Sequence, residues 1–348
     1  MRWIELSHRW LGGLIGLLMA VIGISGAILV HRDAWTTVTR KLDAPIQETE
    51  QVAEALTKIM TDRTARTIIL ASPGFAVHRI AYENGGGAYT DQSGNVLVHW
   101  DSQWARPELW LSDLHRRLFS GEAGEIVIGI MGLAGVFFTV TGTILWWRTR
   151  QTFNFRLLPK RLSRPAIVRH HRDIGIMMAP LLLLSLVTGS VMVFRPLSSI
   201  VLGPGAAAAI EVAARPPHPL SVQMSRDVDW AGIVKTAHVR FPKADVRGVS
   251  LPRKGNGLIT VRMKQPWEWL PNGRTTLWFA ADTGRLVAAQ DPGHSPTQVQ
   301  MYYLLYPLHA GKVGGVAYRL VMTMSGLALG LLGTLAVWTF WFHHKRTG

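Results

Sequence analysis

The chain has 348 residues and a formal net charge of +15, yet only 17% of its residues are charged, against about 25% in typical globular proteins. It contains no cysteine, which excludes disulfide frameworks, thiolate zinc sites, iron–sulfur clusters and covalently attached haem. Histidine, present 13 times, is therefore the main soft ligand that the chain offers to a metal.

Four uncharged apolar runs are long enough to cross the roughly 30 Å hydrocarbon core of a bilayer as helices, at about 1.5 Å rise per residue. They are residues 11–30, 126–147, 174–194 and 320–342. The first run is too long for the apolar core of a secretory signal, so we interpret it as a retained helix. The sequence predicts a mainly α-helical membrane protein with four transmembrane helices.

Basic residues flank these runs unequally, which predicts the orientation of the helices. The segment 148–173 carries eight lysines and arginines and the single acid Asp173, and both terminal tails are also basic. Because basic residues in short segments resist translocation, we expect both termini and this segment in the cytoplasm and the two long segments outside it. The positive charge is then a topology signal, and we expect no nucleic-acid partner.

The expected domains follow this division of the chain. They are transmembrane helix 1 (1–31), a first outer module (32–112), transmembrane helix 2 with its lead-in (113–148), a cytoplasmic loop (149–169), transmembrane helix 3 (170–195), a second outer module (196–304), transmembrane helix 4 with its lead-in (305–344) and a cytoplasmic tail (345–348).

The two halves of the chain are a tandem duplication. His-Arg-x-x-Gly occurs at His8 and at His171, three residues before an apolar run, and Leu-His occurs with His115 and His309, 11 residues before the other two runs. The outer modules also match, because each predicts a short helix (50–60 and 228–241), apolar strands (67–71 and 258–263) and a hairpin with an Asp and Gly turn (89–97 and 279–287). Residues 203–209 are interpreted as a linker.

The duplicated histidines predict two metal-binding stations. We expect His8 to meet His171 at one end of the bundle and His115 to meet His309 at the other. Two imidazoles offered across a helical gap are what six-coordinate haem iron accepts, so we expect two non-covalent b-type haems. For any single histidine, an interfacial role is the alternative. Glycines on the first two apolar runs either open a slot for the macrocycle or serve close helix packing.

Cationic side chains close to these histidines are candidate partners of the haem propionates. They are Arg9, Arg172, Arg116, Arg117 and Lys312.

Four further histidines lie near the ends of the apolar runs. His170 precedes His171 and points about 100° away from it on a helix, so we expect it not to face the partner. His31 has no histidine counterpart, since Phe194 takes its place in the second half. Because it lies at the outer end of the first run, it is either a reserve ligand or a substrate-side group. His343 and His344 are interpreted as interfacial residues. The histidines of the outer modules are interpreted as surface or strand residues.

These elements closely resemble the PepSY-associated membrane-helix family, which comprises iron-regulated inner-membrane proteins of bacteria. The matching motifs are His-Arg-Trp-Leu-Gly at residues 8–12, Thr-Gly-Thr-Ile-Leu-Trp-Trp-Arg at 141–148, the third helix start at His171, Leu-His-Ala-Gly at 308–311 and Asp-Thr-Gly at 282–284. The resemblance spans nearly the whole chain. It implies two periplasmic α+β PepSY-like modules and, in the branch that the chain resembles most, haem-dependent reduction of ferric siderophores such as ferrioxamine. The end of the fourth run departs from the Trp-Trp-Arg pattern of the second.

The expected function is therefore electron transfer across a bacterial inner membrane to a periplasmic ferric siderophore of hydroxamate type, which releases Fe(II). No nicotinamide or flavin motif is present, so a cytoplasmic reductase or membrane quinol is the expected donor. Two alternatives remain open: a haem-free PepSY scaffold that binds a periplasmic partner, and a transporter of iron or a metal chelate.

Overall fold

A computed structural model describes residues 2–62, 64–156, 158–253 and 255–342 of the chain. It divides into a helical unit, Met1–Arg32, Trp110–Val201 and Leu305–Gly348, and a sheet unit, Asp33–Leu109 and Leu202–Leu304. Each expected outer module is thus a separate stretch of chain that contributes to the sheet unit. The expected tail 345–348, together with His343 and His344, lies outside the described residues.

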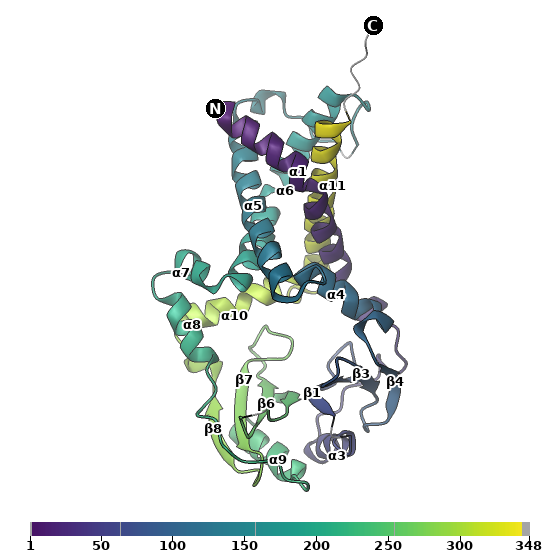
Figure 1. Ribbon diagram of the computed structural model, residues 1–348, viewed down its shortest axis with the longest axis vertical. Helices are drawn as coiled ribbons and strands as arrows, with labels where there is room; N and C mark the ends of the chain where they lie inside the picture. Colours follow the sequence, from purple (N-terminus) through teal and green to yellow (C-terminus); the bar gives the residue numbers. More distant parts are fainter. Residues whose placement is uncertain (1, 63, 157, 254, 343–348) are drawn as a thin grey trace. The chain divides into compact units, whose positions relative to one another are not determined.

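Four long apolar helices make up most of the helical unit, which confirms the predicted membrane spans (Figure 1). They are α1 (Arg2–Val30), α5 (Gly121–Trp147), α6 (Arg164–Val193) and α11 (Gly315–Trp341). α1 lies against α11 and α5, and α6 lies against α5 and α11, so α1 and α6 face each other diagonally. The start of α1, the end of α11 and the α5–α6 connection lie at one end of this unit (Figure 1).

Small residues allow α1 and α11 to approach each other closely. A Cβ atom on Gly16 would lie 2.6 Å from the Gly333 carbonyl oxygen, and one on Gly23 would lie 2.6 Å from that of Gly326. Such contacts exclude any side chain larger than hydrogen. The close-packing interpretation is therefore confirmed for these glycines, and the expectation that they open a slot is wrong.

Two helices lead into the spans and then stop. α4 (Pro107–Arg117) precedes α5, and α10 (Thr297–His309) precedes α11. Leu118, Phe119 and Gly121 end α4 with positive φ values of 49°, 59° and 58°, and Gly311 and Gly314 both have φ of 64° after α10. Left-handed backbone cannot continue a right-handed helix. Each lead-in helix therefore turns sharply before its span.

The described residues of the sheet unit form an antiparallel sheet of eight strands, in the order β4-β3-β2-β1-β5-β6-β7-β8. The strands are β1 (Ala65–Ile69), β2 (His78–Tyr82), β3 (Gly87–Thr90), β4 (Val96–Trp100), β5 (Asp245–Ser250), β6 (Leu258–Lys264), β7 (Thr275–Ala280) and β8 (Leu286–Gln290). Each module supplies one four-stranded meander. They join where Ile68 of β1 pairs with Val249 of β5.

Two equivalent helices, α3 (Thr49–Ile59) and α9 (Trp230–Arg240), pack on this sheet. Leu56 and Ile233 from the helices and Ile68 and Val249 from the central strands belong to one buried apolar cluster. The two modules thus share a core as well as a sheet.

The part of the chain that the structure describes also contains the short α-helices α2 (Arg32–Trp35), α7 (Ser198–Val201) and α8 (Ala206–Ala214) and the 3-10 helices η1 (Gln103–Ala105), η2 (Arg150–Thr152), η3 (Arg195–Leu197) and η4 (Pro292–His294). The linker expected at 203–209 is wrong in its second half, because α8 begins at Ala206. Alanine favours helix, and Ala206 and Ile210 are buried against Val299 of α10.

Candidate functional site

The four duplicated histidines form two pairs within the helical unit. The ring centres of His8 on α1 and His171 on α6 are 6.3 Å apart, with an angle of 90° between the ring planes. The ring centres of His115 on α4 and His309 on α10 are also 6.3 Å apart, with an angle of 43°. We call these the α1–α6 pair and the α4–α10 pair.

The separation within each pair suits one metal ion between two imidazoles. Metal–imidazole bonds of about 2 Å place the two ligand nitrogens about 4 Å apart, and each ring centre lies roughly 1 Å behind its nitrogen. The ring centres are then about 6 Å apart, and both observed pairs match this value. The residues present therefore fit a bis-imidazole haem at each pair.

The turn after each lead-in helix brings the α4–α10 pair back against the spans. His115, in the last turn of α4, meets Ser25 and Ile22 of α1, and His309, in the last turn of α10, meets Thr188 and Ser185 of α6. A continuous helix would have carried each histidine roughly 16 Å beyond its apolar run. Instead, both histidines reach partners inside the spans, because glycines and left-handed residues fold the lead-ins back.

Both imidazoles of the α4–α10 pair are held in the same way. The His115 Nδ1–H donates to the Ile22 carbonyl at 3.1 Å, and Ser25 Oγ lies 3.0 Å from the same nitrogen. The His309 Nδ1–H donates to the Ser185 carbonyl at 3.0 Å, with Thr188 Oγ1 at 3.1 Å. Because a carbonyl only accepts hydrogen bonds, the proton lies on Nδ1, and Nε2 keeps the lone pair that a metal needs.

His8 is held by a single hydroxyl group. Its Nδ1 lies 2.8 Å from Thr141 Oγ1 of α5, and this hydroxyl donates its own proton to the Phe137 carbonyl at 2.7 Å. Thr141 therefore accepts from the His8 Nδ1–H, which again leaves Nε2 unprotonated. His171 differs, since its Nδ1 is buried without a hydrogen-bond partner among the described residues.

A glycine lies next to three of the imidazoles, immediately after the hydroxyl residue. A Cβ on Gly26 would lie 2.9 Å from His115 Cε1, one on Gly189 would lie 3.1 Å from His309 Cε1, and one on Gly142 would lie 3.4 Å from His8 Cε1. The dipeptides Ser25-Gly26, Thr188-Gly189 and Thr141-Gly142 thus place a hydroxyl and a space for the ring on one helical face. Ser25-Gly26 and Thr188-Gly189 stand at equivalent places in the two halves, so the duplication carried this signal, although the predicted site did not include the hydroxyl residues.

The remaining predicted site residues lie as follows. His31 Nε2 is 2.8 Å from Thr323 Oγ1 of α11, so this side chain is held against another helix. His170 is buried next to His171, and His171 is the residue that faces His8. The roles of His31 as a reserve ligand and of the two pairs as ligands stay predictions.

The predicted propionate partners have different surroundings. Arg9 and Arg116 are exposed, and the Arg117 Nε lies 3.4 Å from Glu125 Oε2 in an exposed ion pair. The Lys312 backbone N–H donates to the Pro307 carbonyl in the turn after α10. Their role toward propionates stays a prediction.

Arg172 is engaged in structure. Its Nη2 lies 2.6 Å from Asp173 Oδ1, and its Nη1 donates to Thr152 Oγ1 at 2.8 Å. Asp173 is buried and also accepts from the Asn154 backbone N–H at 3.3 Å. The Arg172 guanidinium therefore braces the segment between α5 and α6, and its role toward a propionate stays a prediction.

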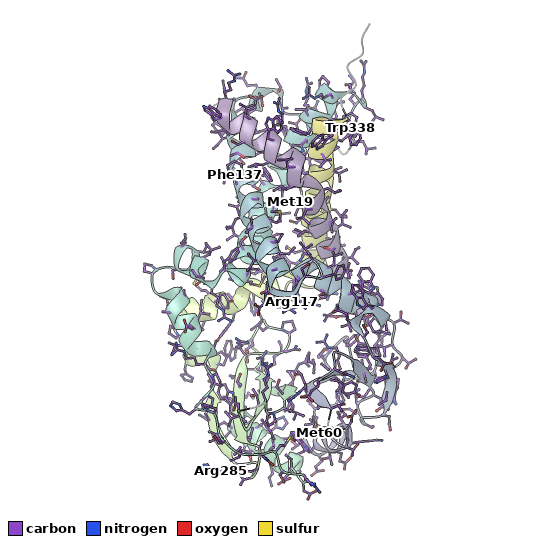
Figure 2. The ribbon with its side chains drawn as sticks, viewed as in Figure 1. Met19, Met60, Arg117, Phe137, Arg285 and Trp338 are labelled. Carbon is purple, nitrogen blue, oxygen red and sulfur yellow. The ribbon has the colours of Figure 1, made fainter. Side chains whose placement is uncertain are left out.

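An apolar cluster separates the two pairs. Met19, Leu182, Leu186 and Leu332 are buried together, and Figure 2 labels Met19 near the middle of the helical unit. Among the described residues, no three His, Asp or Glu side chains gather at a point where they could hold a bare metal ion. The donor set consists of imidazole pairs, which suits haem better than a catalytic zinc or iron centre.

A comparison with known families identifies the chain at the family level. The family described as the PepSY-associated TM region matches residues 6–343, which is nearly the whole length. The chain therefore belongs to this family. No curated protein matches it.

Proposed function

We propose that this member of the PepSY-associated TM region family is a di-haem b electron-transfer protein that reduces ferric siderophores outside a bacterial inner membrane. The observation that supports the proposal is the pair of equivalent stations, each with two imidazoles at 6.3 Å between ring centres. Haem held by two imidazoles supplies a one-electron Fe(III)/Fe(II) couple with no open coordination position. His8 with His171 and His115 with His309 would hold the two groups.

The chain's own residues orient and separate these stations. Hydrogen bonds from Nδ1 fix the rings of His8, His115 and His309 so that Nε2 is free for iron. From His8 to Ser25, α1 spans roughly 25 Å at about 1.5 Å per residue, so the stations lie near opposite ends of this span. The Met19 cluster offers buried apolar side chains and no polar ligand between them, which favours electron transfer over iron transport.

The proposed donor and acceptor lie on opposite sides of the membrane. The donor is a cytoplasmic reductase or a membrane quinol at the α1–α6 pair, because this end carries the basic segment that we expect in the cytoplasm. The acceptor is a ferric hydroxamate siderophore. One electron reduces each Fe(III) to Fe(II), which oxygen donors bind less tightly because the ion is softer and less highly charged.

The charge of the second outer segment bears on the acceptor. Residues 195–312 contain 14 lysines and arginines against 7 aspartates and glutamates. A positive surface raises the local concentration of anionic ligands and repels cations. We expect neutral or anionic ferric chelates to react faster than strongly cationic ones.

Haem content tests the cofactor proposal. Protein expressed with ample haem should show a sharp reduced α band and two haems per chain by pyridine haemochrome assay. His171→Ala and His309→Ala should each remove one of the two signals. His170→Ala is the matched control, since this neighbour is buried on another side of α6 and should leave both. No bound haem in the wild type would favour the scaffold alternative.

Iron release tests the acceptor proposal. Anaerobically reduced protein mixed with a ferric hydroxamate should reoxidise while a ferrous-specific dye gains colour. His309→Ala should lose this reaction although its remaining haem is still reducible. If the wild type binds both haems but no ferric chelate reoxidises it, the siderophore reductase assignment is wrong.

A further inference from the structure

The four imidazoles differ in the hydrogen bonds that their Nδ1 atoms make. We infer that haem at the α4–α10 pair has a lower reduction potential than haem at the α1–α6 pair, with Ser25 and Thr188 as positioning residues. This inference rests on the proposed binding of haem at both pairs. It concerns the order of the two potentials, which that proposal leaves open.

Each imidazole of the α4–α10 pair has two acceptors. A backbone carbonyl lies at 3.1 Å from His115 Nδ1 and at 3.0 Å from His309 Nδ1, and a hydroxyl oxygen lies at 3.0 and 3.1 Å respectively. Ser25 Oγ also donates to the Ile22 carbonyl at 3.0 Å, and Thr188 Oγ1 lies 3.1 Å from the Ser185 carbonyl. The hydroxyl protons therefore point at carbonyls, and the hydroxyl oxygens face the imidazole N–H groups as acceptors.

The α1–α6 pair has fewer acceptors. His8 has the Thr141 hydroxyl alone. His171 has the Leu332 carbonyl beside its ring, but its Nδ1 makes no hydrogen bond of normal geometry to any described residue. The duplication explains this difference. Thr141 and Leu335 stand the same number of residues after His115 and His309, so leucine occupies the position in the second half that would supply the fourth hydroxyl.

Hydrogen bonding of this kind changes the donor strength of the ligand. An imidazole that donates from Nδ1 gains negative character at Nε2 and becomes a more basic ligand. A more basic ligand stabilises the more highly charged ferric iron, and it therefore lowers the reduction potential. Two imidazoles that each have two acceptors should give the more reducing centre. The pair in which His8 has one acceptor and His171 has only the poorly aligned Leu332 carbonyl should give the less reducing one.

This order suits the proposed direction of electron flow to a tightly chelated acceptor. The centre at the α4–α10 pair would have the stronger reducing power, which ferric chelates require because strong chelation of Fe(III) makes it hard to reduce. The less reducing centre at the α1–α6 pair would accept electrons readily from a donor. In the expected orientation, a membrane potential that is negative inside assists the outward step.

Redox titration of the haem-loaded full chain, followed by absorption spectroscopy, tests the inference without any activity assay. The wild type should give two midpoints. The single-haem variants His171→Ala and His309→Ala assign them, because His309→Ala should keep the higher midpoint and His171→Ala the lower.

Substitutions of the hydrogen-bonding residues then test the cause. Ser25→Ala and Thr188→Val should shift the lower midpoint upward, and only in part, since the Ile22 and Ser185 carbonyls remain. Thr188→Ser keeps the hydroxyl and should restore the wild-type value. Leu335→Thr should add an acceptor near His171 and shift the higher midpoint downward.

Thr139→Val is the matched control, because the Thr139 hydroxyl donates to the Gly135 carbonyl on the same helix and bonds to no histidine. It should leave both midpoints unchanged. Equal midpoints, the reverse order, or midpoints insensitive to Thr188 and Leu335 would overturn the inference while the haem proposal stands. A chain that binds no haem would instead overturn the proposed function.

Discussion

At the scale of single residues, the site depends on small groups that support the histidines. Ser25-Gly26 and Thr188-Gly189 occupy equivalent positions in the two halves, and each supplies both an acceptor and room for a ring. The hydroxyl fixes which imidazole nitrogen is protonated, and the missing Cβ lets the ring lie against the helix backbone. These neighbours orient the His115 and His309 rings, as the proposed haem sites require.

Gly26→Ala should therefore weaken haem binding at the α4–α10 pair. The new Cβ would lie 2.9 Å from His115 Cε1, so the ring must move. Overpacking of this kind costs about 1–3 kcal/mol, and haem affinity at this pair should fall roughly tenfold or more. Haem titration of the apoprotein measures the change. Gly175→Ala is the control, because its Cβ would meet nothing nearer than Leu332 Cδ2 at 3.9 Å.

The sheet unit contains a buried histidine with a different role. His78 on β2 is 3% exposed, and its Nδ1 accepts a hydrogen bond from the Ala71 backbone N–H at 2.9 Å. Burial lowers the pKa of His78 to about 4, although the nearby Asp91 carboxylate opposes this. The folded unit therefore holds His78 neutral, in contrast to an exposed histidine.

Stability of the sheet unit should consequently fall as the pH is lowered. Below about pH 6.5 the unfolded chain binds a proton at His78 that the folded chain does not bind until about pH 4. The loss should total about 3 kcal/mol across this window and be absent above it. Thermal unfolding in detergent at several pH values measures it. His78→Asn, which can still accept from Ala71, should flatten the profile, whereas His99→Asn at an exposed position should not.

At the scale of elements, the lead-in helices α4 and α10 determine where the second pair lies. Their sequences contain one histidine each in the last turn, and the following left-handed residues turn the chain back. Figure 2 labels Arg117, the last residue of α4, at this turn. The carbonyl of Arg117 packs against Gly124 in the first turn of α5. The position of His115 thus depends on a glycine nine residues away.

Gly124→Ala should displace α4 and remove haem from the α4–α10 pair. A Cβ on Gly124 would lie only 1.6 Å from the Arg117 carbonyl oxygen, and backbone cannot yield as a side chain can. Pyridine haemochrome assay should give about half of the wild-type haem. Gly121→Asn is the control for a general effect of replacing a glycine in this turn. Gly121 has a φ of 58° and open space around its Cβ position, and asparagine tolerates this backbone conformation, so the haem content should not change. Full haem content in Gly124→Ala would contradict this account of the turn.

The elements also show which features the sequence could predict. The lengths of the apolar runs predicted the four spans, because this signal is local in the sequence. The repeated His-Arg-x-x-Gly and Leu-His motifs predicted which histidines lie together, because the duplication places them at equivalent positions. The pairing of Ile68 with Val249 joins strands far apart in the chain, and no local pattern specifies it. The engagement of Arg172 by Asp173 and Thr152 depends on how the α5–α6 segment folds, and no local pattern in the sequence specifies it.

At the scale of the whole molecule, the duplication places one pair of imidazoles near each end of the helical unit. The start of α1, the end of α11 and the α5–α6 connection lie at the same end of that unit (Figure 1). Reporter fusions after Arg150 and after Gly284 should therefore report opposite compartments, with the first in the cytoplasm because Arg150 belongs to the segment 148–173 with its eight basic residues. A periplasmic signal after Arg150 would exchange the roles of the two pairs. Fusion expression, checked by immunoblot, controls for unstable products.

The same arrangement predicts that electrons cross the molecule while iron does not. Haem-loaded protein in sealed vesicles, with a membrane-impermeant reductant inside and a ferric hydroxamate outside, should produce Fe(II) outside only. The reason is the Met19, Leu182, Leu186 and Leu332 cluster, which offers no polar ligand to an ion between the two pairs. Radioactive iron inside the vesicles should stay at the level of protein-free vesicles, and His309→Ala vesicles should lose the external Fe(II). Iron accumulation inside the vesicles above that level would contradict the electron-transfer assignment and favour the transporter alternative.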